Sequence, residues 1–120
     1  MKPNEEKLIR RIEKVKMRLH EITDMRPGKL SQQYNVCGSP TCKCKANPPQ
    51  KHGPYYQISF TRKGKSSSRF VKKEDLELVR RQLRDYVRLR ALVDEWIDLG
   101  GELAELRLEA ERETRSRSSA

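Results

Sequence analysis

Three cysteines and one histidine lie close together near the middle of this 120-residue chain. Cys37, Cys42 and Cys44 fall within eight residues, and His52 follows after seven more, so the spacing is C-x4-C-x-C-x7-H. Three thiolates and an imidazole make a complete tetrahedral set for Zn²⁺, and a site with four protein ligands is structural rather than catalytic. The pattern predicts one structural zinc ion, and it leaves open whether His52 is the fourth ligand.

The surroundings of the cysteines favour metal binding over other uses of a thiol. Lys43 and Lys45 flank the ligands, and cationic neighbours lower the pKa of a thiol and so favour the metal-binding thiolate. A disulfide is disfavoured because the number of cysteines is odd and the chain is expected to be cytoplasmic. A redox or nucleophilic cysteine stays open as an alternative, although it would not need two more cysteines so close in sequence.

Positive charge is concentrated around this cluster. The formal net charge is +10, and residues 26–73, called the basic segment, hold the whole excess because they contain no Asp or Glu. Their cations are Arg26, Lys29, Lys43, Lys45, Lys51, Arg62, Lys63, Lys65, Arg69, Lys72 and Lys73. Such a segment predicts an anionic partner, since carboxylates facing phosphates would weaken binding. The alternative is a solvated loop that happens to lack acids.

A β-hairpin is predicted after the cysteine cluster. Residues 55–60 alternate between two faces, and residues 67–72 are the expected partner strand across a turn at residues 62–65. One face would carry Tyr56, Ile58 and Phe60 and cover the helices. The outer face is expected to expose Tyr55, Gln57, Ser59, Thr61 and Arg69.

The hairpin and the cysteine loop together predict a nucleic-acid-binding surface. Lys and Arg would pair with phosphates, Gln57 and Arg69 would reach base edges, and Tyr55 would stack on an unpaired base. The predicted contact residues are Lys43, Lys45, Lys51, Tyr55, Gln57, Arg62, Lys63, Lys65, Arg69 and Lys72. For any single residue the alternative is structural: a tyrosine in the core, or a lysine in a solvated turn.

Amphipathic helices are predicted on both sides of the basic segment. In residues 1–25 the apolar positions follow a heptad spacing typical of a coiled coil: Leu8, Ile12, Val15, Leu19 and Ile22. Residues 74–99 carry a second continuous apolar stripe. Gly100-Gly101 are expected to break this helix, leaving a short helix at residues 102–112 and a flexible tail at residues 113–120. The predicted fold class is α+β and mainly helical, with two long amphipathic helices flanking a small zinc loop and hairpin.

The composition limits how such a chain can be stabilised. Only 34% of the residues are hydrophobic, so a metal, long paired helices or a partner chain should be needed. A homodimer through the helices is therefore a hypothesis. No run approaches 18 apolar residues and the N-terminus lacks the apolar stretch of a signal peptide, so we expect a cytoplasmic protein with no membrane partner.

Residues 26–97 resemble a family of small prokaryotic proteins classed only as a domain of unknown function. The resemblance rests on the segments Arg26–Ser31, Tyr34–Gly38, Cys42-Lys43-Cys44 and Lys51–Tyr56, with the motifs CG-x3-C-x-C and HGPYY. It extends to the helix around Tyr86 to Trp96. It implies a zinc-finger-like module followed by a helical hairpin, and it implies no established activity.

Two classes of function are compatible with these features, and a third, an enzyme, is disfavoured. The first is a nucleic-acid-binding protein whose zinc fixes a small basic platform. The second is a protein-interaction adaptor, in which the zinc is only structural and the helices dock on a larger partner such as a nuclease or transposase. An enzyme is not expected, because the chain has two histidines, no Gly-rich phosphate loop and no acid in its basic segment to act as a base.

Overall fold

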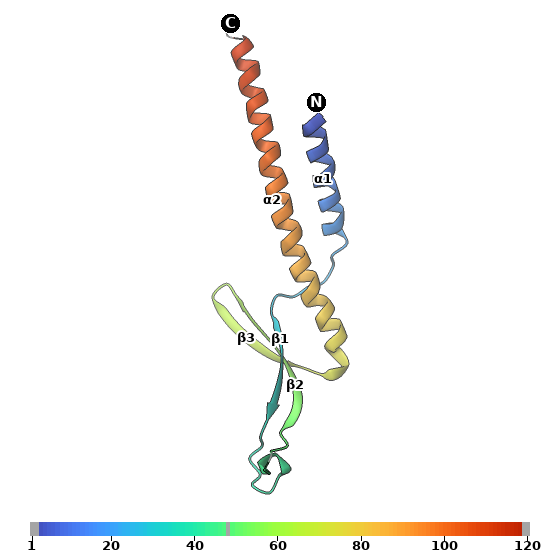
Figure 1. Ribbon diagram of the computed structural model, residues 1–120, viewed down its shortest axis with the longest axis vertical. Helices are drawn as coiled ribbons and strands as arrows, with labels where there is room; N and C mark the ends of the chain where they lie inside the picture. The colour runs from blue at the N-terminus through green and yellow to red at the C-terminus, as the bar shows by residue number, and fades with distance from the viewer. Residues whose placement is uncertain (1–2, 48, 119–120) are drawn as a thin grey trace. The chain divides into compact units, whose positions relative to one another are not determined.

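The computed structural model describes residues 3–47 and 49–118, which form two helices and one sheet (Figure 1). The elements in chain order are α1 (Pro3–His20), β1 (Lys29–Asn35), a 3₁₀ turn (Lys43–Lys45), β2 (His52–Arg62), β3 (Lys65–Val71), a second 3₁₀ turn (Lys73–Asp75) and α2 (Leu76–Ser118). This confirms the predicted mainly helical α+β class. The elements divide into two compact units. The helical unit comprises residues up to 24 with residues from 87 onward, and the sheet unit comprises residues 25–86.

The helical unit is an antiparallel pair formed by α1 and the C-terminal part of α2. Its core confirms the heptad seam of α1. The buried members are Leu8, Ile12, Val15, Leu92, Leu99 and Leu103. Ion pairs connect the helices at both ends of α1, with Arg107 Nε 3.0 Å from Glu5 Oε1 and Arg88 2.9 Å from Glu21 Oε2. Each buried leucine contributes about 1.5–3 kcal/mol and each exposed ion pair about 0–1 kcal/mol, so the apolar seam holds this unit together.

The helix α1 is shorter than predicted. It ends at His20, and the chain beyond it forms i→i−3 bonds, from the Glu21 amide to the Arg18 carbonyl and from the Ile22 amide to the Leu19 carbonyl. Thr23 and Asp24 follow, with the Thr23 hydroxyl donating to the Asp24 carboxylate at 3.1 Å. Short polar side chains of this kind compete for backbone bonds and favour helix ends, which explains why the helix does not reach residue 25.

The predicted break at Gly100-Gly101 is wrong, and so is the separate short helix at residues 102–112. α2 is continuous from Leu76 to Ser118. Two interior glycines cost about 1 kcal/mol each relative to alanine, whereas Leu99 and Leu103 on either side of them are buried against α1 and contribute about 1.5–3 kcal/mol each. Packing therefore outweighs propensity. The helix also begins two residues later than predicted, because residues 73–75 form the 3₁₀ turn.

The predicted flexible tail is helical through Ser118. The Thr114 hydroxyl donates to the Ala110 carbonyl and the Ser118 hydroxyl donates to the Thr114 carbonyl, both at 3.0 Å. Arg115 and Arg117 lie in the last turn, where cations interact favourably with the helix dipole. The last two residues of the predicted tail, 119 and 120, lie outside the described residues.

Replacing Gly101 by alanine is expected to stabilise the protein by about 0.5–1 kcal/mol, because a helical glycine loses more backbone entropy on folding. A Cβ at Gly101 would meet no atom within 4 Å, and one at Gly100 would lie 3.8 Å from Trp96 Cδ1, an ordinary contact. Chemical unfolding followed by far-UV circular dichroism measures the change. Gly100→Ala is a second variant for which the same stabilisation is expected. A helix that is broken in solution would gain nothing from either substitution.

The sheet is antiparallel with strand order β1-β2-β3. The hairpin between β2 and β3 is confirmed, and its loop is the two-residue turn Lys63-Gly64 with φ angles of 53° and 77°. Two central residues with positive φ match the type I′ turn, whose twist suits a tight hairpin. The strand β1 was not predicted. It pairs with β2 from Lys29↔Ser59 to Asn35↔His52, with a bulge between Gln33 and Asn35.

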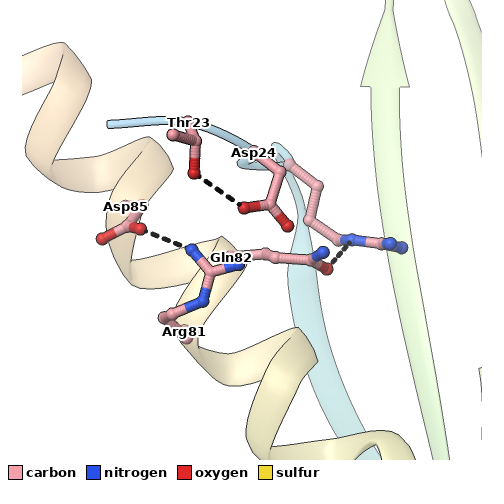
Figure 2. Close-up of polar contacts among 6 residues, drawn as sticks. Thr23, Asp24, Arg81, Gln82 and Asp85 are labelled. Carbon is pink, nitrogen blue, oxygen red and sulfur yellow. Dashed lines mark hydrogen bonds and ion pairs between the residues drawn. The ribbon is translucent and has the colours of Figure 1, made fainter. Parts of the chain in front are cut away.

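One face of the sheet is covered at Ile58 within the sheet unit, while Phe60 farther along the same face stays exposed. Ile58 is 2% exposed, and the first turns of α2 supply the buried side chains Leu76 and Val79. Gln82 is buried as well, and it accepts a 2.7 Å hydrogen bond from Arg26 Nε (Figure 2). The Arg26 amide also donates to the Gln82 carbonyl at 3.3 Å. These bonds fix the segment that enters β1 against α2. None of the described helices has the length and apolar character needed to cross a membrane.

Candidate metal centre

Residues 36–51, called the metal loop, connect the ends of β1 and β2. The pairing of Asn35 with His52 closes the loop at its base, and Figure 1 shows the loop at the end of the sheet away from the β2–β3 turn. Within it, the amide of Lys45 donates to the Cys42 carbonyl at 2.9 Å, and the amides of Ala46 and Gln50 donate to the Lys43 carbonyl at 3.0 and 3.1 Å. This turn brings Cys42 and Cys44 back toward Cys37 and His52.

The four predicted ligands come together. One ligand atom from each of Cys37, Cys42, Cys44 and His52 lies within 4.8 Å of the other three. The Sγ atoms of Cys37 and Cys44 are 3.5 Å apart, and Cys42 Sγ is 3.2 Å from His52 Nε2. A tetrahedral ion with Zn–S bonds of about 2.3 Å requires sulfur atoms about 3.8 Å apart. The site therefore has the donor types and nearly the spacing of a closed tetrahedral metal centre, with His52 in the fourth position.

The electrostatic environment of the thiols also suits a metal. A hydrogen bond from the Ser39 backbone, followed by bonds from His52 and the neighbouring thiols, lowers the pKa of Cys37 to about 6. Cys44 is 1% exposed. The Cys37 amide donates to its sulfur, but burial and the neighbouring thiols outweigh that bond and raise the pKa of the Cys44 thiol. Cys44 would ionise beside the Cys37 thiolate only with a compensating cation, which a divalent ion bound by all four residues would supply.

The predicted contact lysines and arginines form two groups rather than one patch. Lys43, Lys45 and Lys51 lie exposed on the metal loop, whereas Arg62, Lys63 and Lys65 lie exposed at the β2–β3 turn. β2 is 11 residues long and ends at Arg62, and at about 3.3 Å per residue its two ends are up to roughly 33 Å apart. Lys72 is exposed just after β3. Tyr55 and Gln57 lie on β2 between the two groups.

The predicted position of Arg69 on the outer face is wrong. Arg69 pairs with Ile58 in the β2–β3 register, and directly opposed residues share a face. Arg69 therefore lies on the Ile58 face and lines a cavity of about 320 Å³ with Arg26 and Phe60. The residue opposite Gln57 is Phe70, which is 65% exposed. Sequence reasoning missed Phe70, although the parity of the register across the turn would have identified it.

The outer face of the sheet also holds an amide pair. Gln33 Nε2 donates to Gln57 Oε1 at 2.6 Å, joining β1 to β2 on the same face as Tyr55. Gln33 was not predicted as a site residue because β1 was not predicted as a strand.

The fold and the site define a small α+β protein with a Cys₃His candidate metal centre. The chain belongs to the family described as a domain of unknown function, DUF6788, whose model matches residues 5–81. The match covers the metal loop and the whole sheet, together with most of α1 and the start of α2. Comparison with curated proteins and with solved structures gives no match.

Proposed function

We propose that this chain is a zinc-binding protein that binds nucleic acid through its basic segment, and that it is not an enzyme. Cys37, Cys42, Cys44 and His52 would hold one Zn²⁺ ion, which would act as a structural crosslink in a loop that has little core of its own. Three thiolates and an imidazole suit zinc better than hard cations. Four protein ligands leave no open position for substrate or water, so the site is proposed as structural.

The observation that carries the nucleic-acid proposal is the charge of the basic segment. All its lysines are exposed, and 48 consecutive residues contain no carboxylate side chain. Phosphate contacts release counterions, so binding should weaken steeply with salt. On the order of four to six contacts would give a log–log slope near −4 to −5 on duplex DNA. The two cationic groups at the ends of β2 would contact the same nucleic acid with the sheet between them.

Neutralising the β2–β3 turn is expected to reduce the salt slope by about 3, because each lost phosphate contact removes about 0.9 on duplex DNA. The variant is Arg62→Gln, Lys63→Gln and Lys65→Gln. Its matched control is Arg112→Gln, Arg115→Gln and Arg117→Gln, which changes the net charge equally but lies at the exposed end of α2. Fluorescence anisotropy between 50 and about 300 mM salt measures both. An equal effect of both variants would assign the binding to net charge alone, and no binding at 50 mM would overturn the proposal.

A protein-interaction adaptor is the second candidate, and exposed apolar side chains on the helices favour it. Val87 is 67% exposed, Ile97 64% and Met17 68%, and exposed apolar side chains of this kind are ones that a larger protein or a second copy of this chain could cover. The same pair of variants separates the two candidates, since an adaptor would tolerate neutralisation of the β2–β3 turn. Sedimentation equilibrium that gives only a 14.1 kDa species would remove the homodimer.

A further inference from the structure

The outer face of the sheet exposes two aromatic rings on neighbouring strands. Tyr55 lies on β2 two residues before Gln57, and Phe70 on β3 lies directly opposite Gln57, so all three share this face. Tyr55 is 43% exposed and Phe70 65% exposed. Exposed rings on a strand face are not explained by the core, because Ile58 and its buried neighbours lie on the other side of the sheet.

The two rings border two adjacent hollows. One has a volume of about 450 Å³ and is lined by both rings together with Val71, Lys72 and Lys73. The other has a volume of about 350 Å³ and is lined by both rings with Val36 and His52. Both volumes lie within the range of sites that take small molecules. Each ring therefore offers an apolar wall to either hollow, with lysines beside one of them.

These features match the chemistry of unpaired nucleotides better than that of a duplex. A base stacked on an aromatic side chain contributes about 1–3 kcal/mol whatever its sequence, and in a duplex the base faces are already stacked on one another. Sheets that bind single strands use aromatic residues on adjacent strands in this way. Lys29 is on the same face and Lys72 follows β3, so cations are available for the phosphates, and no acidic side chain of the basic segment opposes them.

We propose that Tyr55 and Phe70 stack on the bases of single-stranded nucleic acid, while Lys29, Lys72 and Lys73 contact its phosphates. The inference rests on the proposed nucleic-acid binding and names its substrate class. The Gln33–Gln57 amide pair beside the rings supplies hydrogen-bonding groups for a base edge. DNA and RNA share the stacking chemistry, and the 2′-hydroxyl decides between them.

The test is fluorescence anisotropy with a labelled 12-nucleotide oligo(dT), a 12-nucleotide oligo(U) and a 12-base-pair DNA duplex. The wild-type chain should bind at least one single strand about tenfold or more tightly than the duplex. Tyr55→Ala and Phe70→Ala should each lower single-strand affinity by about 5- to 100-fold, and leave duplex affinity within about twofold.

Tyr55→Leu and Phe70→Leu guard against poor folding of the alanine variants. They keep apolar bulk but lose the flat ring, so they should show the same loss of single-strand affinity. Phe60→Ala is the matched control, because Phe60 is 38% exposed on the opposite face.

The outcomes separate this inference from the function on which it rests. Duplex binding that equals or exceeds single-strand binding, with no effect of the Leu variants, would overturn the stacking inference and leave the phosphate-binding proposal standing. Absence of binding to all three oligonucleotides at 50 mM salt would overturn both. Binding of a Pro-rich peptide that competes with oligo(dT) and depends on the same rings would identify the face as a peptide site and reject the inference.

Discussion

Removing the proposed metal ion is expected to unfold the metal loop while leaving the helical unit folded. The loop has 16 residues, and Cys44 is the only buried side chain among those of its residues that the structure describes. The loop therefore has almost no core to replace the ion. In zinc-finger peptides, zinc binding contributes about 10–16 kcal/mol at neutral pH, far more than a loop of this size gains from packing. The helical unit has its own buried leucines and should not depend on the ion.

Hydrogen–deuterium exchange before and after treatment with a chelator measures this difference. Backbone amides of residues 36–51 should lose protection and those of α1 should keep it. Elemental analysis should give about one zinc per chain, and Cys44→Ser should lose the metal, whereas Ser39→Ala, a loop variant that removes no ligand, should retain it. Protection of the metal loop that survives chelation would show that the loop folds without a metal, and the structural role would be wrong.

Gly53→Ala is expected to have the second largest effect, a loss of about 2–4 kcal/mol with release of the metal. Gly53 has φ +136°, a conformation available almost only to glycine. A Cβ there would lie 2.8 Å from the Gln33 carbonyl oxygen and 3.0 Å from Tyr34 Cδ1. Backbone strain and overpacking cost about 1–3 kcal/mol each. Since His52 is the preceding residue, β1 and β2 cannot separate to relieve the contact without moving this candidate ligand.

The matched control for Gly53 is Gly64 in the β2–β3 turn. Its φ is also positive, +77°, but a Cβ there would meet no atom within 4 Å. Gly64→Ala should therefore cost only the backbone term, about 1–2 kcal/mol, and should keep the metal. Chemical unfolding and zinc content measure both variants. If Gly53→Ala and Gly64→Ala lose the same stability and Gly53→Ala keeps its zinc, the close approach to Gln33 does not destabilise the variant.

The features that the sequence predicted well are those set by spacing along the chain. The heptad seam of α1 depends on helical periodicity alone, and the four candidate ligands lie within 16 residues, so one loop and its closing strand residue bring them together. The β2–β3 hairpin was predictable for the same reason, because strong strand signals flank Lys63-Gly64.

The features that the sequence did not predict depend on contacts between distant segments. β1 has only a weak alternation of apolar and polar residues, and its pairing with β2 across the metal loop is what makes it a strand. The continuity of α2 through Gly100-Gly101 depends on leucines that pack against α1, about 90 residues away in sequence. Phe70 is a different case, because the register across the local Lys63-Gly64 turn places it opposite Gln57, and that register could have been worked out from the sequence.

The sheet has two outer strands, and their composition affects whether the sheets of two molecules can pair edge to edge. Within the described residues, β1 and β3 each pair on one side only. Their remaining backbone groups could in principle template another strand. β3 carries Lys65, Arg69 and three consecutive serines, and β1 begins at Lys29. Charged, short and polar outer strands resist edge-to-edge aggregation. The cations proposed to attract phosphates would thus also keep neighbouring sheets apart, and this protection against polymerisation is weakest in concentrated salt, where charges are screened.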